Sequence, residues 1–139
     1  MNLEELLVPT HGERFYNITD QIKESHKTLN PRQQSGIFYL FLMHTSCGLC
    51  LNEAFDPSAQ KDLESFLKIL APRNASFITH TTEGPDDSPS HMKSLLTSQS
   101  LILPVEQGKL MLGTWQGIYL CEFRDVPHQR KIMLKFKAD

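Results

Sequence analysis

The sequence predicts an α+β fold, with one compact domain whose antiparallel β-sheets form a sandwich or barrel-like core with two to three helices. Three observations favour this fold class. The helical patterns lie before residue 97, strand patterns gather after residue 100, and the last strand alternates apolar with charged residues. Such alternation is typical of an antiparallel strand with one face in water. The length of 139 residues suits a single domain over residues 1–139.

The N-terminal segment 1–12 is expected to be irregular, because no apolar period appears in it or in the next few residues. A helix follows, for which Thr19 and Asp20 are suitable caps and which Pro31 ends or closely follows. Its apolar positions are Ile18, Ile22 and Leu29.

The middle of the chain shows two strand patterns and one clear helix. Gly36–Met43 is expected to be a buried strand and Cys47–Glu53 its partner strand. Asp56 followed by Pro57 is typical of an N-cap with proline at the first helical position. The amphipathic stripe of this second helix consists of Leu63, Phe66, Leu67 and Leu70, and Ala71-Pro72 ends it.

The last part of the chain is expected to be mostly strand. Ser76–Thr79 is compatible with a short strand, and Ser88-Pro89 repeats the cap-then-proline pattern before a short helix with Met92, Leu95 and Leu96. The remaining strands are expected at Ser100–Val105, Lys109–Leu112, Gly117–Arg124 and Arg130–Lys137. In the last of these, Ile132, Leu134 and Phe136 alternate with Lys131, Lys135 and Lys137.

Composition excludes several functional classes. Apolar residues make up 40% and charged residues 22% of the chain, with a net charge of −2, as in ordinary globular proteins. The absence of a basic excess argues against a nucleic-acid partner. The longest apolar run, Ile37–Met43, is too short to span a bilayer. No basic stretch precedes an apolar one at the N-terminus, so we expect no signal peptide, and three cysteines favour a reducing, cytoplasmic location.

The first candidate site is the stretch THTTEGPDDSPSHM, Thr79–Met92, which holds two histidines and three carboxylates on a loop and a helix start. Imidazoles bind transition metals, whereas carboxylates can join them or hold Mg²⁺ beside a phosphate. Gly84 permits a sharp turn and the two prolines stiffen the loop. The alternative is an ordinary solvated loop, because Asp, Ser, Pro and Gly are the usual loop residues.

A second polar cluster, His44-Thr45-Ser46, follows the buried strand directly. It places a ring that can act as a general base beside two hydroxyl groups, although neighbours in sequence are rarely a catalytic pair. The alternative is a strand-end turn whose hydroxyls bond the backbone. Asn52 and Glu53 close the next strand.

Cys47 and Cys50 form a CxxC motif in a predicted strand, where their odd spacing directs the two sulfur atoms to opposite faces. Redox motifs of this kind stand at helix N-termini, and no second pair completes a zinc site, so neither role is favoured. Cys121 is expected to be a small apolar residue of a strand.

The only tryptophan, Trp115, stands between Gly113 and Gly117 with polar neighbours on both sides. Its ring could stack on a ligand, or it could simply pack in the core. Glu122 and Arg124 share one face of the predicted strand, so they could pair or reach a site.

The residues quoted above resemble the motifs of the YjbQ family. The fullest match is Ser100-Leu-Ile-Leu-Pro-Val-x-x-Gly108-x-x-x-x-Gly113-Thr-Trp-Gln-Gly-Ile118. The other matching motifs are His44-Thr-Ser, Asn52-Glu53, His80-x-x-Glu83-Gly-x-Asp86-Asp87 and His91-Met-Lys, in the same order. The resemblance extends over residues 13 to 137, with departures near Cys47, where the family tends to have alanine, and near Ser98, where it tends to have glycine.

The resemblance implies a compact YjbQ-like α+β fold that assembles as a homotrimer. It also implies the activity of a secondary thiamine-phosphate synthase, a transferase that joins hydroxymethylpyrimidine diphosphate to thiazole phosphate with release of diphosphate. Its site would be built from the histidines and acids quoted above and would sometimes hold a metal or an anion. A small phosphorylated metabolite is therefore the expected partner.

Residue type and family position together suggest roles. The catalytic candidates are Glu83, as acid or base, with His80 and Asp87. The candidate metal ligands are His80, His91, His44 and Asp86, for a divalent metal such as Mg²⁺ or Zn²⁺; no organic cofactor is expected. The candidates for substrate or phosphate binding are Thr45, Ser46, Asn52, Trp115, Gln116 and Arg124.

Three functions remain open from the sequence. The first is the thiamine-phosphate synthase transferase. The second is a metal-dependent hydrolase of a phosphorylated metabolite, and the third is a non-catalytic protein that binds a metal or such a metabolite. A tightly bound transition metal with an open coordination position would favour the second, and a bound metabolite without turnover the third.

Overall fold

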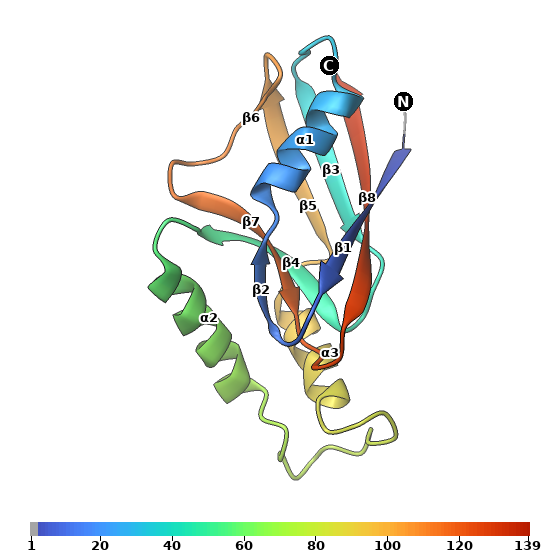
Figure 1. Ribbon diagram of the computed structural model, residues 1–139, viewed down its shortest axis with the longest axis vertical. Helices are drawn as coiled ribbons and strands as arrows, with labels where there is room; N and C mark the ends of the chain where they lie inside the picture. The colour runs from blue at the N-terminus through green and yellow to red at the C-terminus, as the bar shows by residue number, and fades with distance from the viewer. Residues whose placement is uncertain (1–2) are drawn as a thin grey trace.

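Residues 3–139 are described by the structure, a computed structural model, and they form three helices and two antiparallel sheets (Figure 1). The five-stranded sheet has the order β1-β8-β3-β5-β6 and the three-stranded sheet the order β2-β7-β4. The strands are β1 (Leu3–Thr10), β2 (Arg14–Asn17), β3 (Gly36–Leu42), β4 (Cys47–Glu53), β5 (Ser100–Glu106), β6 (Lys109–Leu110), β7 (Gln116–Glu122) and β8 (His128–Ala138). The helices are α1 (Thr19–Leu29), α2 (Pro57–Leu70) and α3 (Asp87–Leu96). The predicted fold class is confirmed.

The core lies between the two sheets and under α1. Ile132, Leu134 and Phe136 of β8 point into it, while Lys131, Lys135 and Lys137 lie on the other face, as the alternation predicts. Ile22 of α1 is fully buried against the same core. No helix among residues 3–139 is long and apolar enough to cross a membrane.

The helix starts match the sequence only in part. Asp56 caps α2 as expected, accepting a hydrogen bond from the amide of Ser58 at 2.9 Å. The predicted cap of α1 is wrong, because Ile18 is the N-cap residue and the Thr19 hydroxyl accepts from the amide of Ile118 instead. Helix α3 begins one residue earlier than the predicted cap at Ser88, which lies inside its first turn.

The expected irregular segment 1–12 is corrected over its described part, because Leu3–Thr10 forms β1 and pairs along its whole length with β8. The strand could not be recognised from alternation of apolar and polar residues. Leu3 and Leu7 are exposed, whereas Glu4 lies on the inward side with Leu6 and Val8. The first two residues of that prediction lie outside the described part of the chain.

Two further strand predictions are wrong. Strand β4 is not the partner of β3, because β3 lies between β8 and β5 whereas β4 pairs with β7 in the other sheet. Ser76–Thr79 is not a strand but part of a turn-rich connection in which Phe77 is exposed. Local patterns report burial and period, but they do not choose the partner of a strand.

The fold brings several chain segments together at one end of the sheets, the lower end in Figure 1. Strands β1, β3 and β7 end there, β4 and β8 begin there, and α3 packs against the start of β4. The amino end of α3, the segment after β3 and the segment after β7 therefore meet, although they are far apart in the sequence.

Candidate functional site

Three ionisable side chains converge at the start of α3. Asp87 and His91 are four residues apart on this helix, so both side chains lie on one face, and His80 reaches them from the preceding loop. The Nε2 atom of His80 lies 2.7 Å from Oδ2 of Asp87, and Nε2 of His91 lies 3.4 Å from the same oxygen. One donor atom from each residue fits within 4.8 Å of the other two. We call His80, Asp87 and His91 the His–Asp–His cluster.

Hydrogen bonds fix the orientation of His91. Its Nδ1 lies 2.8 Å from the carbonyl oxygen of Thr45, which can only accept, so Nδ1 carries the proton. In this tautomer Nε2 is the nitrogen that has a lone pair for the cluster, which is the arrangement a metal-ligating histidine needs. Asp87 is buried, whereas 54% of the His80 side chain is exposed.

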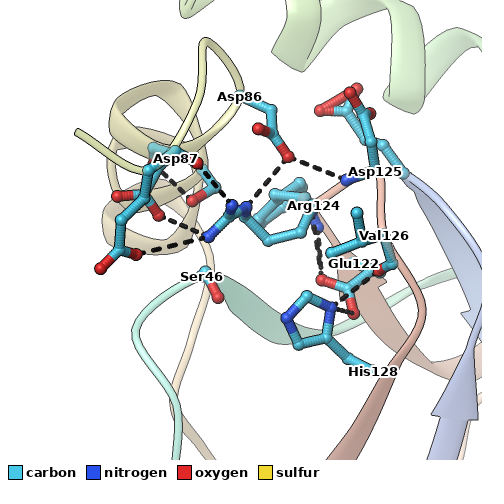
Figure 2. Close-up of polar contacts among 12 residues, drawn as sticks. Ser46, Asp86, Asp87, Glu122, Arg124, Asp125, Val126 and His128 are labelled. Atoms are coloured by element: carbon cyan, nitrogen blue, oxygen red, sulfur yellow. Dashed lines mark hydrogen bonds and ion pairs between the residues drawn. The ribbon is translucent and has the colours of Figure 1, made fainter. Parts of the chain in front are cut away.

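Arg124, two residues past the end of β7, holds the acidic side of the cluster (Figure 2). Its NH1 atom donates to Oδ1 of Asp87 at 2.7 Å, its Nε atom to Oδ2 of Asp86 at 2.9 Å, and its NH2 atom to the carbonyl of Glu83 at 3.0 Å. Burial raises the pKa of Asp86, but the amide of Asp125 and the Arg124 guanidinium outweigh it and bring that pKa below its ordinary value. Asp86 is thus held as a carboxylate.

The donor set of the cluster, two imidazole nitrogens and one carboxylate oxygen, suits a transition metal such as Zn²⁺ better than Mg²⁺, which prefers oxygen ligands. Three protein ligands would leave coordination positions for a substrate or water. An open hollow of about 580 Å³ adjoins the cluster. It is lined by His44, Thr45, His80, Ser88, His91, Ser94, Leu95 and Gln99.

The other two candidate metal ligands have different partners. Asp86 bonds Arg124 and the amide of Asp125 through the same oxygen, Oδ2. The Nε2 atom of His44 accepts a hydrogen bond from the amide of Lys131 at 2.7 Å, so this nitrogen has no free lone pair. The structure thus brings His80 and His91 together with Asp87, and directs Asp86 and His44 elsewhere.

The candidate phosphate-binding residues fall into two groups at opposite ends of the sheet. Thr45, Ser46 and Arg124 lie near the cluster, but the Ser46 hydroxyl accepts from NH2 of Arg130 at 2.9 Å and Arg124 is engaged by the aspartates. Strand β4 pairs with β7 from Cys47 opposite Glu122 to Glu53 opposite Gln116. The second group, Asn52, Trp115 and Gln116, therefore lies about 20 Å away along the strands.

Trp115 does not pack in the core, which was the alternative considered from the sequence. Its side chain is 57% exposed and stands edge-on against Phe55, with ring centroids 5.1 Å apart. Glu83, the candidate acid or base, lies at the rim of the cluster, with Oε2 3.9 Å from NH1 of Arg124 and its side chain 68% exposed.

Sequence reasoning missed the buried ion pair of Arg130 and Glu122, which lies beneath Ser46. Arg130 donates to Glu122 through Nε and NH2, and the Thr10 hydroxyl also donates to Glu122. The sequence did contain an indication of this pair. Arg130 alternates with Ile132 and Leu134 along β8, so its side chain is on the face that points into the core. A charged residue in a core-facing phase requires a buried partner.

The cysteines lie as expected from their spacing. Cys47 faces the core between the sheets, whereas Cys50 packs on the opposite face. The Sγ atom of Cys50 lies 3.7 Å from that of Cys121, and all three cysteines are free thiols. None of them belongs to the His–Asp–His cluster.

Comparison with known proteins gives a family match. The model of the family described as UPF0047 protein YjbQ-like matches residues 4–139. The chain is 44% identical over 125 residues to UPF0047 protein YjbQ of Salmonella typhimurium, covering 90% of this chain and 89% of that protein. It is 37% identical over 138 residues to UPF0047 protein sll1880 of Synechocystis, covering 98% and 91% of the two chains.

Solved structures agree with this match. A conserved hypothetical protein from Thermus thermophilus superposes with a TM-score of 0.85 at 39% identity, covering 96% of this chain and 99% of that one. A protein of the YjbQ/UPF0047 family from Clostridium acetobutylicum gives 0.83 at 31% identity, covering 99% and 100%. Both similarities cover nearly the whole chain.

Proposed function

The chain belongs to the UPF0047 YjbQ-like family, and from that premise we propose that it is a metal-dependent enzyme acting on a small phosphorylated metabolite. The reaction we propose first is transfer of hydroxymethylpyrimidine from its diphosphate to thiazole phosphate, which yields thiamine phosphate. The observation that carries the proposal is the convergence of His80, Asp87 and His91 beside an open hollow. Sites of this kind, concave with few convergent polar groups, are where ligands bind.

A divalent transition metal bound at the cluster would supply Lewis acidity to a phosphate oxygen. Residues of the chain orient the atoms that would bind this metal. Asp87 offers Oδ2 to the cluster because Arg124 holds Oδ1, and His91 offers Nε2 because Thr45 holds Nδ1. The protein thus holds two of the three candidate donors in place before any ligand arrives, which lowers the cost of binding.

The remaining polar groups of the site would handle the substrate. Glu83 stands at the rim with most of its carboxylate exposed, so it can exchange a proton with a bound ligand and with water. The Thr45 and Ser88 side chains line the hollow and can bond a phosphate oxygen. Because the charge of Arg124 is engaged by two aspartates, it is better suited to positioning Asp87 than to binding the diphosphate.

Hydrolysis of a phosphorylated metabolite is the second candidate. One observation favours it: the His80 side chain is 54% exposed, so water reaches the cluster from the open hollow. A transferase of two heterocycles would have to exclude that water from its reactive intermediate. Occupation of the hollow by the acceptor is one way to do so, and product analysis separates the two reactions.

The homotrimer and the cytoplasmic location expected from the sequence remain part of the proposal. Large exposed apolar side chains, among them Leu95, Ile69 and Phe55, support an assembly of copies. Sedimentation equilibrium of the purified chain measures its state directly, and a monomer at all concentrations would remove the trimer from the proposal.

The test of the activity is thiamine phosphate formation from the two phosphorylated precursors, with chelator-treated protein and added Zn²⁺ or Mg²⁺. Wild type is compared with His80→Ala and with His11→Ala, which removes an exposed histidine that is not part of the cluster. We expect product with wild type and His11→Ala, and a loss of more than about 100-fold in His80→Ala, since even residues that only support a ligand affect activity 10- to 100-fold.

The outcomes separate the candidate functions. Phosphate or diphosphate release without thiamine phosphate, abolished in His80→Ala, would favour the hydrolase. Metal binding by wild type without either product would favour a binding protein. Equal product with wild type and His80→Ala would contradict a catalytic role for the cluster.

A further inference from the structure

His44 lies in the segment after β3 and lines the same hollow as His80 and His91. Its Nε2 atom lies 2.7 Å from the backbone nitrogen of Lys131, which can only donate. Nε2 must therefore be the acceptor, the ring is neutral, and the proton is on Nδ1. That N–H has no hydrogen-bond partner among residues 3–139. A backbone group thus fixes His44 as a donor that is free to bind a ligand.

The surroundings of His44 favour the neutral form of its ring. Burial lowers its pKa, and the nearby positive charges of Arg130, His128 and Lys131 lower it further, against an opposing effect of Glu122. The lowered pKa agrees with the neutral ring that the Lys131 contact requires. The adjacent Thr45 side chain is exposed and lines the hollow as well.

We propose that the Nδ1–H group of His44, together with the Thr45 hydroxyl, forms an anion subsite that binds a phosphate oxygen of the ligand in the hollow beside the His–Asp–His cluster. This assigns His44 a role different from that of a metal ligand or a general base. It deepens the proposed function, on which it rests for the identity of the ligand as a phosphorylated metabolite. The subsite itself needs only the hollow and the fixed ring.

Two substitutions separate a donor role from a structural one. In His44→Asn the amide nitrogen occupies the place of Nδ1, so the donor is kept while the acceptor for the Lys131 amide is lost. In His44→Gln the amide oxygen reaches the place of Nε2, so the Lys131 contact is kept and the donor at Nδ1 is lost. A purely structural role would make Asn the more harmful change.

The probe is inorganic diphosphate, titrated calorimetrically into wild type and both variants, with Zn²⁺ titrated separately. We expect His44→Gln to bind diphosphate about tenfold or more weakly, the usual effect of removing a hydrogen bond to a charged group, and to bind Zn²⁺ like wild type. His44→Asn should stay within about threefold of wild type for diphosphate, since it keeps the donor.

Other outcomes would contradict the proposed subsite or separate it from the metal-dependent function. Wild-type diphosphate affinity in His44→Gln, or no diphosphate binding by wild type, would overturn it. Loss of Zn²⁺ affinity together with diphosphate affinity in His44→Gln would make His44 a metal ligand and overturn it too. If wild type binds no metal but the diphosphate affinities follow the expected order, the subsite stands and the metal-dependent function fails.

Discussion

Arg124 and Asp87 form a close ion pair, with NH1 of the guanidinium 2.7 Å from Oδ1 of the carboxylate. The two oxygens of the Asp87 carboxylate therefore contact different residues. Oδ1 contacts Arg124, and Oδ2 lies 2.7 Å from Nε2 of His80. The segment after β7 thereby orients a group at the start of α3. Partners of this kind set the direction and basicity of a metal ligand.

The first prediction concerns Arg124. Replacing it by glutamine in Arg124→Gln leaves Oδ1 of Asp87 without its charged partner, so the carboxylate gains freedom and loses its alignment with His80. We expect Zn²⁺ affinity to fall about 10- to 100-fold, measured by competition with a chromophoric chelator. Arg32→Gln is the matched control, since Arg32 is exposed and belongs to another hollow, and it should leave the affinity unchanged. Equal affinity in both variants would show that Arg124 does not orient the ligand.

The second prediction separates the two neighbouring aspartates. Asp87→Asn removes the charge of the one carboxylate that touches both histidines, and we expect Zn²⁺ affinity to fall by more than about 100-fold. Asp86→Asn removes the same charge one residue away, from a carboxylate that touches only Arg124 and the amide of Asp125. Its effect should be about tenfold or less, through Arg124 alone. A larger loss in Asp86→Asn than in Asp87→Asn would instead make Asp86 the ligand, as the sequence alone had suggested.

The third prediction concerns the ion pair beneath the site. Glu122 and Arg130 are both nearly inaccessible to water, so Glu122→Gln leaves a buried guanidinium without its counter-charge. We expect a loss of about 3–5 kcal/mol in the free energy of unfolding, measured by urea denaturation. Glu5→Gln is the control, because it removes one half of the exposed ion pair between Glu5 and Lys131. It should lower the free energy of unfolding by less than about 1 kcal/mol. Similar losses in the two variants would contradict the importance given to burial.

The sequence predicted those parts of the fold in which local pattern and burial agree. The alternation of Ile132, Leu134 and Phe136 located β8, and Asp56-Pro57 located the start of α2. It failed for β1, where Leu3 and Leu7 face outward, and for the pairing of β4, which depends on contacts with β7 far along the chain. Pairing is decided by the whole core, which no local window contains.

The candidate site shows the same division. The motif His80 to His91 held all three residues of the cluster, because two of them are four residues apart on one helix and the third lies in the adjoining loop. The sequence could not show that Arg124 turns toward Asp87 and not toward a phosphate, since this depends on a contact between residues 37 positions apart. It also could not distinguish the two nitrogens of His44, because the donor that decides between them is a backbone amide of β8.

The fourth prediction concerns stability below neutral pH. His26 is buried in α1 against the rings of Phe38 and Phe136, and its Nε2 lies 3.3 Å from the amide nitrogen of Asn30. Burial lowers its pKa below the ordinary value of 6.5. The unfolded chain then binds a proton at a higher pH than the folded chain does. The stabilisation is complete above the unfolded pKa and is lost as pH falls through the folded one.

His26→Gln tests this linkage, because glutamine can still accept a hydrogen bond from Asn30 but does not titrate. We expect the urea concentration at the unfolding midpoint of wild type to decrease as the pH is lowered from about 7.5 to about 5. The midpoint of His26→Gln should decrease by less over the same interval. The comparison uses the change with pH and not the midpoint itself, so a general destabilisation by the substitution does not affect it. His11→Gln, which alters an exposed histidine, should follow wild type. A pH dependence in His26→Gln as steep as that of wild type would assign the loss to other groups, among them His44, whose pKa is also lowered by burial.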